Sequence, residues 1–316
     1  MRFLLALAFA LAAGSALAQY PNRPIKLIVP FPPAGATDIV GRIVAQKLGE
    51  RLGQSVVVEN KPGAGGSIGS DIVAKSVPDG HTLLMATSST HSIGPSLQKL
   101  PYDPIRDFAA ITHVANVPNV LVLSPALPAK DVKEFVALAK SRPGQLNFAS
   151  SGVGTIVHLN GELFKMIAGI DLLHVPYKGT ALAIPDVANG NIAMLFDSLA
   201  SVMPHVRSNK VRPIAVNAPA RSQLLPEVPT FAEIGMTDYD TYTWFGMFAP
   251  AGTPAAALAR VQADVVASLA APDLRERFAQ VGAEPVGSTP QQFTERMLAD
   301  TAKWARVIKA ANVRLQ

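Results

Sequence analysis

The chain has 316 residues, with 28 Lys+Arg against 23 Asp+Glu, a formal net charge of +5 and no cysteine. The basic residues are spread along the chain without clusters or interleaved aromatics, which argues against a nucleic-acid partner. The absence of thiols excludes disulfides and a lipid-bearing cysteine.

Residues 1–18 have the pattern of a secretory signal peptide. Arg2 precedes an apolar run over 3–12 that is too short to span a membrane, and small residues precede the expected cleavage before Gln19. No other apolar run approaches membrane-spanning length. We therefore expect an exported, soluble periplasmic protein. The remaining 298 residues (316 − 18) are more than one core usually organises, which favours two domains.

The first strand, loop and helix occupy residues 24–52. Apolar residues predict a strand over 25–29, prolines end it, and an apolar stripe predicts a helix from Thr37 to Leu52. The uncharged loop over 31–36 lies where unpaired helical N–H groups and the positive end of the helix dipole can bind an anion. An ordinary strand-to-helix turn is the plainer interpretation of one such loop.

Alternating strands and helices of this length predict parallel sheets covered by helices. Further strands are expected over 55–59, 81–86, 146–149, 172–175, 192–196 and 211–216. Helices are expected near 72–74 and over 132–140, 155–168, 181–188 and 201–209. Two long apolar segments, 109–123 and 242–251, separate these series, and the mostly helical remainder over 254–311 is expected to pack on the first half.

A second possible anion-binding loop lies over 150–154. It follows a strand and opens a helix that Thr155 can cap. His158 lies one turn into this helix, where it could reach a ligand or, equally, form a hydrogen bond with neighbouring backbone. The glycines of 61–69 only partly match a dinucleotide loop, and a tight turn explains them better. The six histidines lack metal-ligand spacing, so neither a cofactor nor a metal is expected.

Eight motifs in order along the chain are PFPPAGATDIVGR, VENKPGAGGSIG, SSGVGTIVHLNGELF, HVPYKG, MLFD, PEVPTFAEIG, WFGMFAPAGTP and TAKWARVIK. Together they resemble the Bug-type solute receptors of tripartite tricarboxylate transporters. The resemblance implies a two-lobe α/β periplasmic binding protein of type II (Venus-flytrap) with two crossing strands. Lobe 1 would be residues 19–123 plus 244–316, and lobe 2 would be residues 124–243.

The resemblance also implies a site for a small carboxylate, held largely by backbone N–H groups and water. The residues carried over are Phe31, Pro33, Ala34, Gly35, Ala36, Thr37, Asp38, Ser88, Ser151, Gly152, Gly154, Thr155, His158, Tyr177 and Asp197. Asp38, in the first turn of its helix, is expected to compensate the helix dipole. Asp197 would repel a second ligand carboxylate and accept a hydrogen bond from an ammonium or hydroxyl group.

The expected function is therefore that of a monomeric, non-enzymatic receptor. It would capture a small organic acid, amino acid or related carboxylated solute and deliver it to inner-membrane transporter subunits. A secreted hydrolase or isomerase on a two-lobe scaffold is the alternative, with His158 and either Ser151 or Thr155 as its candidate pair; no third orienting group is evident. A ligand sensor that feeds a signalling kinase is a further alternative.

Overall fold

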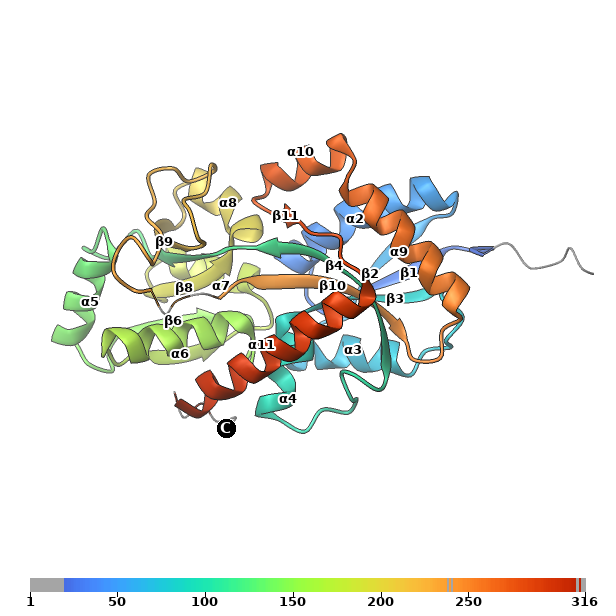
Figure 1. The fold of residues 1–316 in the computed structure, drawn as a ribbon. Helices are drawn as coiled ribbons and strands as arrows, with labels where there is room; N and C mark the ends of the chain where they lie inside the picture. Colours follow the sequence, from blue (N-terminus) through green and yellow to red (C-terminus); the bar gives the residue numbers. More distant parts are fainter. Residues whose placement is uncertain (1–19, 238, 240, 311–312, 314–316) are drawn as a thin grey trace, which may run out of the picture.

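The protein forms two mixed β-sheets, each flanked by helices (Figure 1). The structure, a computed structural model, describes residues 20–237, 239, 241–310 and 313. The expected signal peptide, with cleavage before Gln19, lies outside the described residues. Two α/β units agree with the α/β fold class expected from the sequence.

The first sheet has six strands in the order β11-β4-β10-β3-β1-β2. Its strands are β1 (Ile25–Val29), β2 (Val56–Asn60), β3 (Thr82–Thr87), β4 (Phe108–Val117), β10 (Thr243–Pro250) and β11 (Glu284–Pro285). The helical segments of this unit are α2 (Ala36–Leu52), η2 (Ala64–Gly66), α3 (Ser67–Ala74), η3 (Ser89–Ile93), α4 (Gly94–Leu97), α9 (Ala255–Leu269), α10 (Pro272–Gln280) and α11 (Pro290–Ala310). The segments η2, η3 and α4 were not expected from the sequence.

The second sheet has five strands in the order β7-β6-β8-β5-β9. Its strands are β5 (Asn119–Leu123), β6 (Asn147–Ser150), β7 (Leu173–Pro176), β8 (Met194–Ser198) and β9 (Arg212–Asn217). Its helices are α5 (Val132–Ser141), α6 (Ile156–Ala168), α7 (Thr180–Ala188) and α8 (Leu199–Arg207).

The prediction of parallel sheets is only partly right. Strand β1 is parallel to β2 and β3, and β6 is parallel to β7 and β8. Strand β10 is antiparallel to β3 and β4, and β5 is antiparallel to β8 and β9.

The first change of sheet occurs at Pro118, inside the segment that the sequence analysis treated as one apolar stretch over 109–123. Proline has no N–H to continue a ladder, and β5 pairs with β8 and β9 in the second sheet. Residues 119–123 therefore belong to the second sheet, not to the first unit as predicted. The return occurs before Thr243, where β10 begins, so the predicted boundary before Trp244 differs by one residue.

The two units are in contact, and one helix extends from one to the other. Both large hydrophobic clusters contain residues from both units, for example Phe245 with Leu195 in one cluster. Helix α11 starts on the first unit and extends to the second (Figure 1). Phe293 and Met297 near its start are buried in the first unit, whereas Trp304 and Ile308 pack into the cluster that contains Phe164. The expectation that the C-terminal helices pack on the first half is therefore right for the start of α11 and incomplete for its end.

Candidate functional site

A cavity of about 60 Å³ lies between the two units. Its lining residues are Phe31, Pro32, Pro33, Gly35, Ala36, Thr37, Thr87, Ser89, Ser151, Ile156, Val157, Gly179, Thr180, Ala181, Asp197, Ser198, Thr243 and Phe245. We call this the inner cavity. Most of these residues follow the carboxyl ends of strands, which is where open α/β sheets bind ligands.

The N-termini of α2, α6, α7 and α8 border the inner cavity through the lining residues Thr37, Val157, Thr180 and Ser198. No side-chain hydrogen bond caps α2, α7 or α8, whereas Thr155 caps α6 by accepting the His158 N–H. Among the described residues that line this cavity, none is Lys or Arg. The positive potential here therefore comes from helix ends and backbone N–H groups, which favour an anion.

Two contacts join the units beside the inner cavity. The Ser89 hydroxyl accepts a hydrogen bond of 3.0 Å from the backbone N–H of Ile156, the first residue of α6. Gly179 packs so closely on Pro32 that a Cβ atom at position 179 would lie 2.8 Å from Cγ of the proline. Both contacts require the units to be in the arrangement seen here.

Asp197 is the charged side chain of the inner cavity. It is 3% exposed, and its Oδ1 accepts a hydrogen bond of 2.8 Å from the N–H of Ser198, while Oδ2 has no hydrogen-bond partner. Burial raises the pKa of Asp197 to about 6, although the hydroxyls of Ser201 and Thr180 lie near enough to oppose that rise. Neither hydroxyl forms a hydrogen bond with Oδ2.

A larger cavity of about 770 Å³ adjoins the first and shares Phe31 and Ser151 with it. We call it the outer cavity. It is lined from the first unit by the glycine loop over 63–66 and from the second unit by a more polar set. That set includes Gly152, His158, Glu162, Lys165, Asp171, His174, Tyr177 and Lys178.

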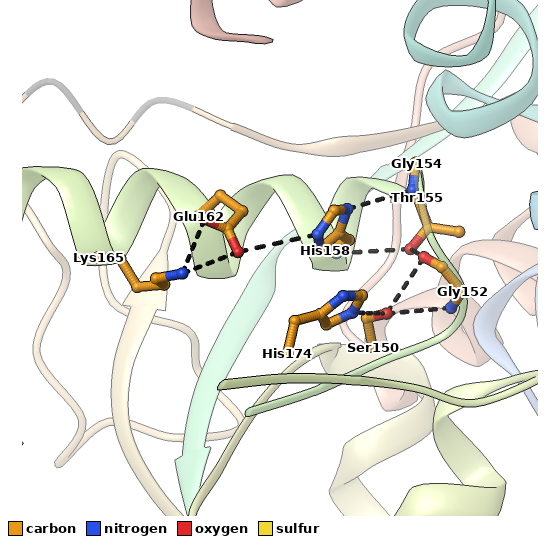
Figure 2. A network of polar contacts seen from close by, with 8 residues as sticks. All are labelled: Ser150, Gly152, Gly154, Thr155, His158, Glu162, Lys165 and His174. Atoms are coloured by element: carbon orange, nitrogen blue, oxygen red, sulfur yellow. Dashed lines mark hydrogen bonds and ion pairs between the residues drawn. The ribbon is translucent and has the colours of Figure 1, made fainter. Parts of the chain in front are cut away.

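A network of polar side chains fixes the loop between β6 and α6 (Figure 2). Nδ1 of His158 accepts a hydrogen bond of 3.2 Å from the N–H of Gly154, and Thr155 Oγ1 donates one of 2.8 Å to the Gly152 carbonyl. Ser150 Oγ accepts from the Gly152 N–H at 3.1 Å and lies 2.7 Å from Nε2 of His174. The loop conformation is thus set from within the second unit, independently of a ligand.

The two histidines of this network are neutral at physiological pH. Their rings stack with centroids 3.9 Å apart. Burial, followed by repulsion from the partner ring and Lys165, lowers the pKa of His158 to about 3. Burial, followed by Lys165, lowers the pKa of His174 to about 4. A neutral ring is what Nδ1 of His158 needs in order to accept the Gly154 N–H.

The residues expected at the site divide into three groups. Phe31, Pro33, Gly35, Ala36, Thr37, Ser151 and Asp197 line the inner cavity. Gly152, His158 and Tyr177 line the outer cavity, which Phe31 and Ser151 also border. Ala34, Asp38, Ser88, Gly154 and Thr155 line neither.

Two of the residues that line neither cavity, Asp38 and Ser88, differ in their contacts. Asp38 accepts hydrogen bonds from the Ala34 N–H, Arg42 and Asn60, and these bonds lower the pKa of Asp38 although burial acts to raise it. The Asp38 carboxylate thus joins the loop residue Ala34 and the strand residue Asn60 to the first turn of α2. Ser88 is fully buried, and its hydroxyl has no partner.

Tyr177 and His158 are each engaged within the second unit. The Tyr177 hydroxyl donates a hydrogen bond of 2.6 Å to Asp186. The ring of His158 accepts a hydrogen bond from neighbouring backbone, which was one of its two expected roles. Thr155 Oγ1 accepts a hydrogen bond from the backbone N–H of His158 rather than from its ring. The arrangement expected for a hydroxyl nucleophile activated by His158 is therefore not formed between these two side chains.

The residues expected at the site do not include several lining residues, among them Thr87, Ser89, Thr180, Ser198, Thr243 and Phe245. The run of hydroxyl residues after β3 was a usable signal, because Thr87 and Ser89 flank the predicted Ser88. Gly179 and Thr180 follow the predicted Tyr177 and begin another helix. The rule used for 150–155, that a loop between a strand and a helix can bind an anion, would also have found these two residues.

No cluster of three or more His, Asp or Glu side chains that could hold a metal ion occurs among the described residues. Within the same part of the chain, no helix is long and apolar enough to cross a membrane.

Residues 40–313 match a family described as the tripartite tricarboxylate transporter family receptor. Similar solved structures include periplasmic binding protein BugD, at 35% identity and a TM-score of 0.90 over 94% of this chain and 100% of that one. R. palustris Rpa4515 with adipate is 35% identical, with a TM-score of 0.91 over 93% and 99% of the two chains. MatC from Rhodopseudomonas palustris with bound malate is 31% identical, with a TM-score of 0.87 over 92% and 100%.

Proposed function

Because the chain belongs to the tripartite tricarboxylate transporter receptor family, we propose that it captures a small carboxylated solute in the inner cavity and delivers it to the inner-membrane subunits of such a transporter. The family consists of solute-binding receptors, and BugD, a relative of the same fold, is a periplasmic binding protein. The observation that carries the proposal is a cavity between two units that is bordered by uncapped helix N-termini.

The ligand carboxylate would be held by backbone N–H groups at the starts of α2 and α7. These helices lack side-chain caps, so their first N–H groups need another acceptor. Each charge-assisted hydrogen bond from such a donor contributes about 1.5–3 kcal/mol. The lining residues that we assign to this role are Gly35, Ala36, Thr37, Gly179 and Thr180.

The relatives support the class of ligand without identifying it for this chain. One was solved with adipate and another with malate, and both ligands are small carboxylates. We propose the same chemical class here: organic acids, amino acids or related carboxylated solutes. The two units would act as the lobes of a binding protein that closes on its ligand, with the crossings at Pro118 and before Thr243 as hinges.

A thermal-shift screen tests the proposal directly. Mono-, di- and tricarboxylates, amino acids and pyridine carboxylates would be added to the full mature chain. A ligand at 100 times its Kd should stabilise the protein by about 2.7 kcal/mol. If no carboxylate raises the melting temperature while the protein is folded by circular dichroism, the proposal is wrong.

Export and the absence of catalysis are further parts of the proposal. The mature N-terminus should be Gln19 or its cyclised form, which intact-mass measurement of periplasmic protein would detect. Incubation of each bound acid with the protein should return it chemically unchanged. Conversion of the acid would favour the hydrolase or isomerase alternative instead. Size-exclusion chromatography should give a monomer.

A further inference from the structure

The carboxylate of Asp197 is a buried acceptor beside the inner cavity, and one of its two oxygens has no hydrogen bond. The side chain is 3% exposed, and Oδ1 is bound by the Ser198 N–H, whereas Oδ2 has no partner. A buried carboxylate oxygen without a hydrogen bond costs free energy, and native proteins usually satisfy such groups. The cavity beside it is where a donor can be supplied.

No side chain of the described residues donates a hydrogen bond to Oδ2 in this structure, although the hydroxyl of the lining residue Thr180 lies near Asp197. Among its described lining residues, none is Lys or Arg that could neutralise Asp197. Ser201 donates its hydroxyl hydrogen to the Ser198 carbonyl, so it is committed elsewhere. A ligand consisting only of carboxylates and methylene groups would bring a second negative charge towards Asp197 and supply no donor.

We propose that Asp197 is a specificity-determining residue that selects carboxylates carrying a hydroxyl or ammonium group, whose hydrogen binds Oδ2. The inference rests on the proposed function, because it assumes that the ligand carboxylate binds in the inner cavity. The ligand would then be complementary to both features of the site. Its carboxylate would lie at the helix N-termini of α2 and α7, and its donor would lie at Asp197.

Calorimetry on matched acids tests this inference. The first series of probes is succinate, L-malate and L-aspartate. The second series is propionate, lactate and alanine, with lactate and alanine each tested as both enantiomers. Within at least one series, the wild-type protein should bind a hydroxyl- or ammonium-bearing acid at least tenfold more tightly than the plain acid. A charge-assisted hydrogen bond in a buried site is strong enough for this difference.

Asp197→Asn should reduce this preference to less than threefold while leaving binding of the plain acid equal or tighter. Asp273→Asn is the matched control, since it removes the same charge from an exposed residue of α10 that lines neither cavity. It should keep the wild-type preference. The wild-type series alone decides the question if Asp197→Asn does not fold.

Equal affinity of the wild-type protein for plain and donor-bearing acids would overturn the role of Asp197 and leave the proposed function intact. Tight binding of succinate with uptake of about one proton would also overturn this role, because Asp197 would then act as a neutral donor. Calorimetry in buffers of different ionisation enthalpy measures the proton uptake. Absence of binding by every acid would contradict both the inference and the proposed function.

Discussion

Nδ1 of His158 accepts a hydrogen bond of 3.2 Å from the backbone N–H of Gly154. This bond uses a donor that the sequence pattern suggested for the ligand, and we propose that His158 acts by positioning the loop. Nε2 of the neighbouring His174 forms a side-chain hydrogen bond of 2.7 Å with Ser150 Oγ. Together they fix the loop that carries Ser151 into the inner cavity.

Replacing the acceptor should loosen this loop. His158→Leu leaves the buried Gly154 N–H without a partner, which we expect to cost about 1–3 kcal/mol of stability, measured by urea unfolding, and to weaken ligand binding. His158→Asn can place a side-chain oxygen near the position of Nδ1, so it should recover part of the lost stability and part of the lost ligand affinity. His205→Leu, near the C-terminal end of α8, is the control. It should change the stability and the ligand affinity much less than His158→Leu does. Equal behaviour of the Leu and Asn variants would contradict a positioning role.

Gly154→Ala tests the same loop through its backbone. Gly154 has φ +78°, and a Cβ atom there would lie 3.2 Å from Cδ1 of Leu97 on the first unit. Gly169→Ala is a matched control with φ +60° and open space around the Cβ. Both variants should lose about 1–2 kcal/mol from the left-handed backbone. Only Gly154→Ala should also weaken ligand affinity in calorimetry, and equal affinities would contradict the interpretation.

The contact of Gly179 with Pro32 predicts an effect on closure. The backbone of Gly179 is extended, with φ 169°, so any residue can adopt it, but a Cβ would lie 2.8 Å from the proline ring of the other unit. Gly179→Ala should therefore hold the units apart and reduce affinity tenfold or more, with a change in melting temperature of only a few degrees. Small-angle scattering should show a larger radius of gyration in the presence of ligand than for the wild type. An unchanged affinity would show that this contact is not needed for binding.

Stability should decrease on mild acidification because several histidines are buried as neutral rings. Burial lowers the pKa of His91 to about 3, and burial is the main cause that lowers the pKa of His113 to about 4. The unfolded chain protonates these rings near pH 6.5, so their contribution to stability is present above pH 6.5 and is lost as the pH falls towards 3–4. Asp197 has the opposite sign, because its raised pKa stabilises the fold at low pH and the benefit is lost as the pH rises through about 6.

For His91 alone the expected loss by pH 5 is about 2 kcal/mol. Urea midpoints at pH 7.5 and pH 5 measure it at constant ionic strength. His91→Phe, which can keep the ring stacked on Phe248, should make the midpoint less sensitive to pH. An equal pH sensitivity in the variant would contradict this assignment.

The local parts of this site could be predicted, whereas the contacts between units could not. The loops after β1 and β6 follow from prolines, glycines and apolar periodicity, which act within a few residues. Thr243 and Phe245 reach the cavity only because β10 returns to the first sheet, and Ser89 only because it meets α6 of the other unit. The role of Pro118 was missed because apolar residues continue on both sides of it, so hydropathy alone gave no boundary.

A crystal structure with the tightest-binding acid from the screen tests most directly whether backbone groups hold the ligand. A ligand carboxylate oxygen should lie about 2.7–3.2 Å from backbone N–H groups of residues 35–37 or 179–181 in the inner cavity, with no Lys or Arg within reach of it. A carboxylate paired instead with Lys165 or Lys178 in the outer cavity, with the inner cavity holding only water, would contradict this expectation.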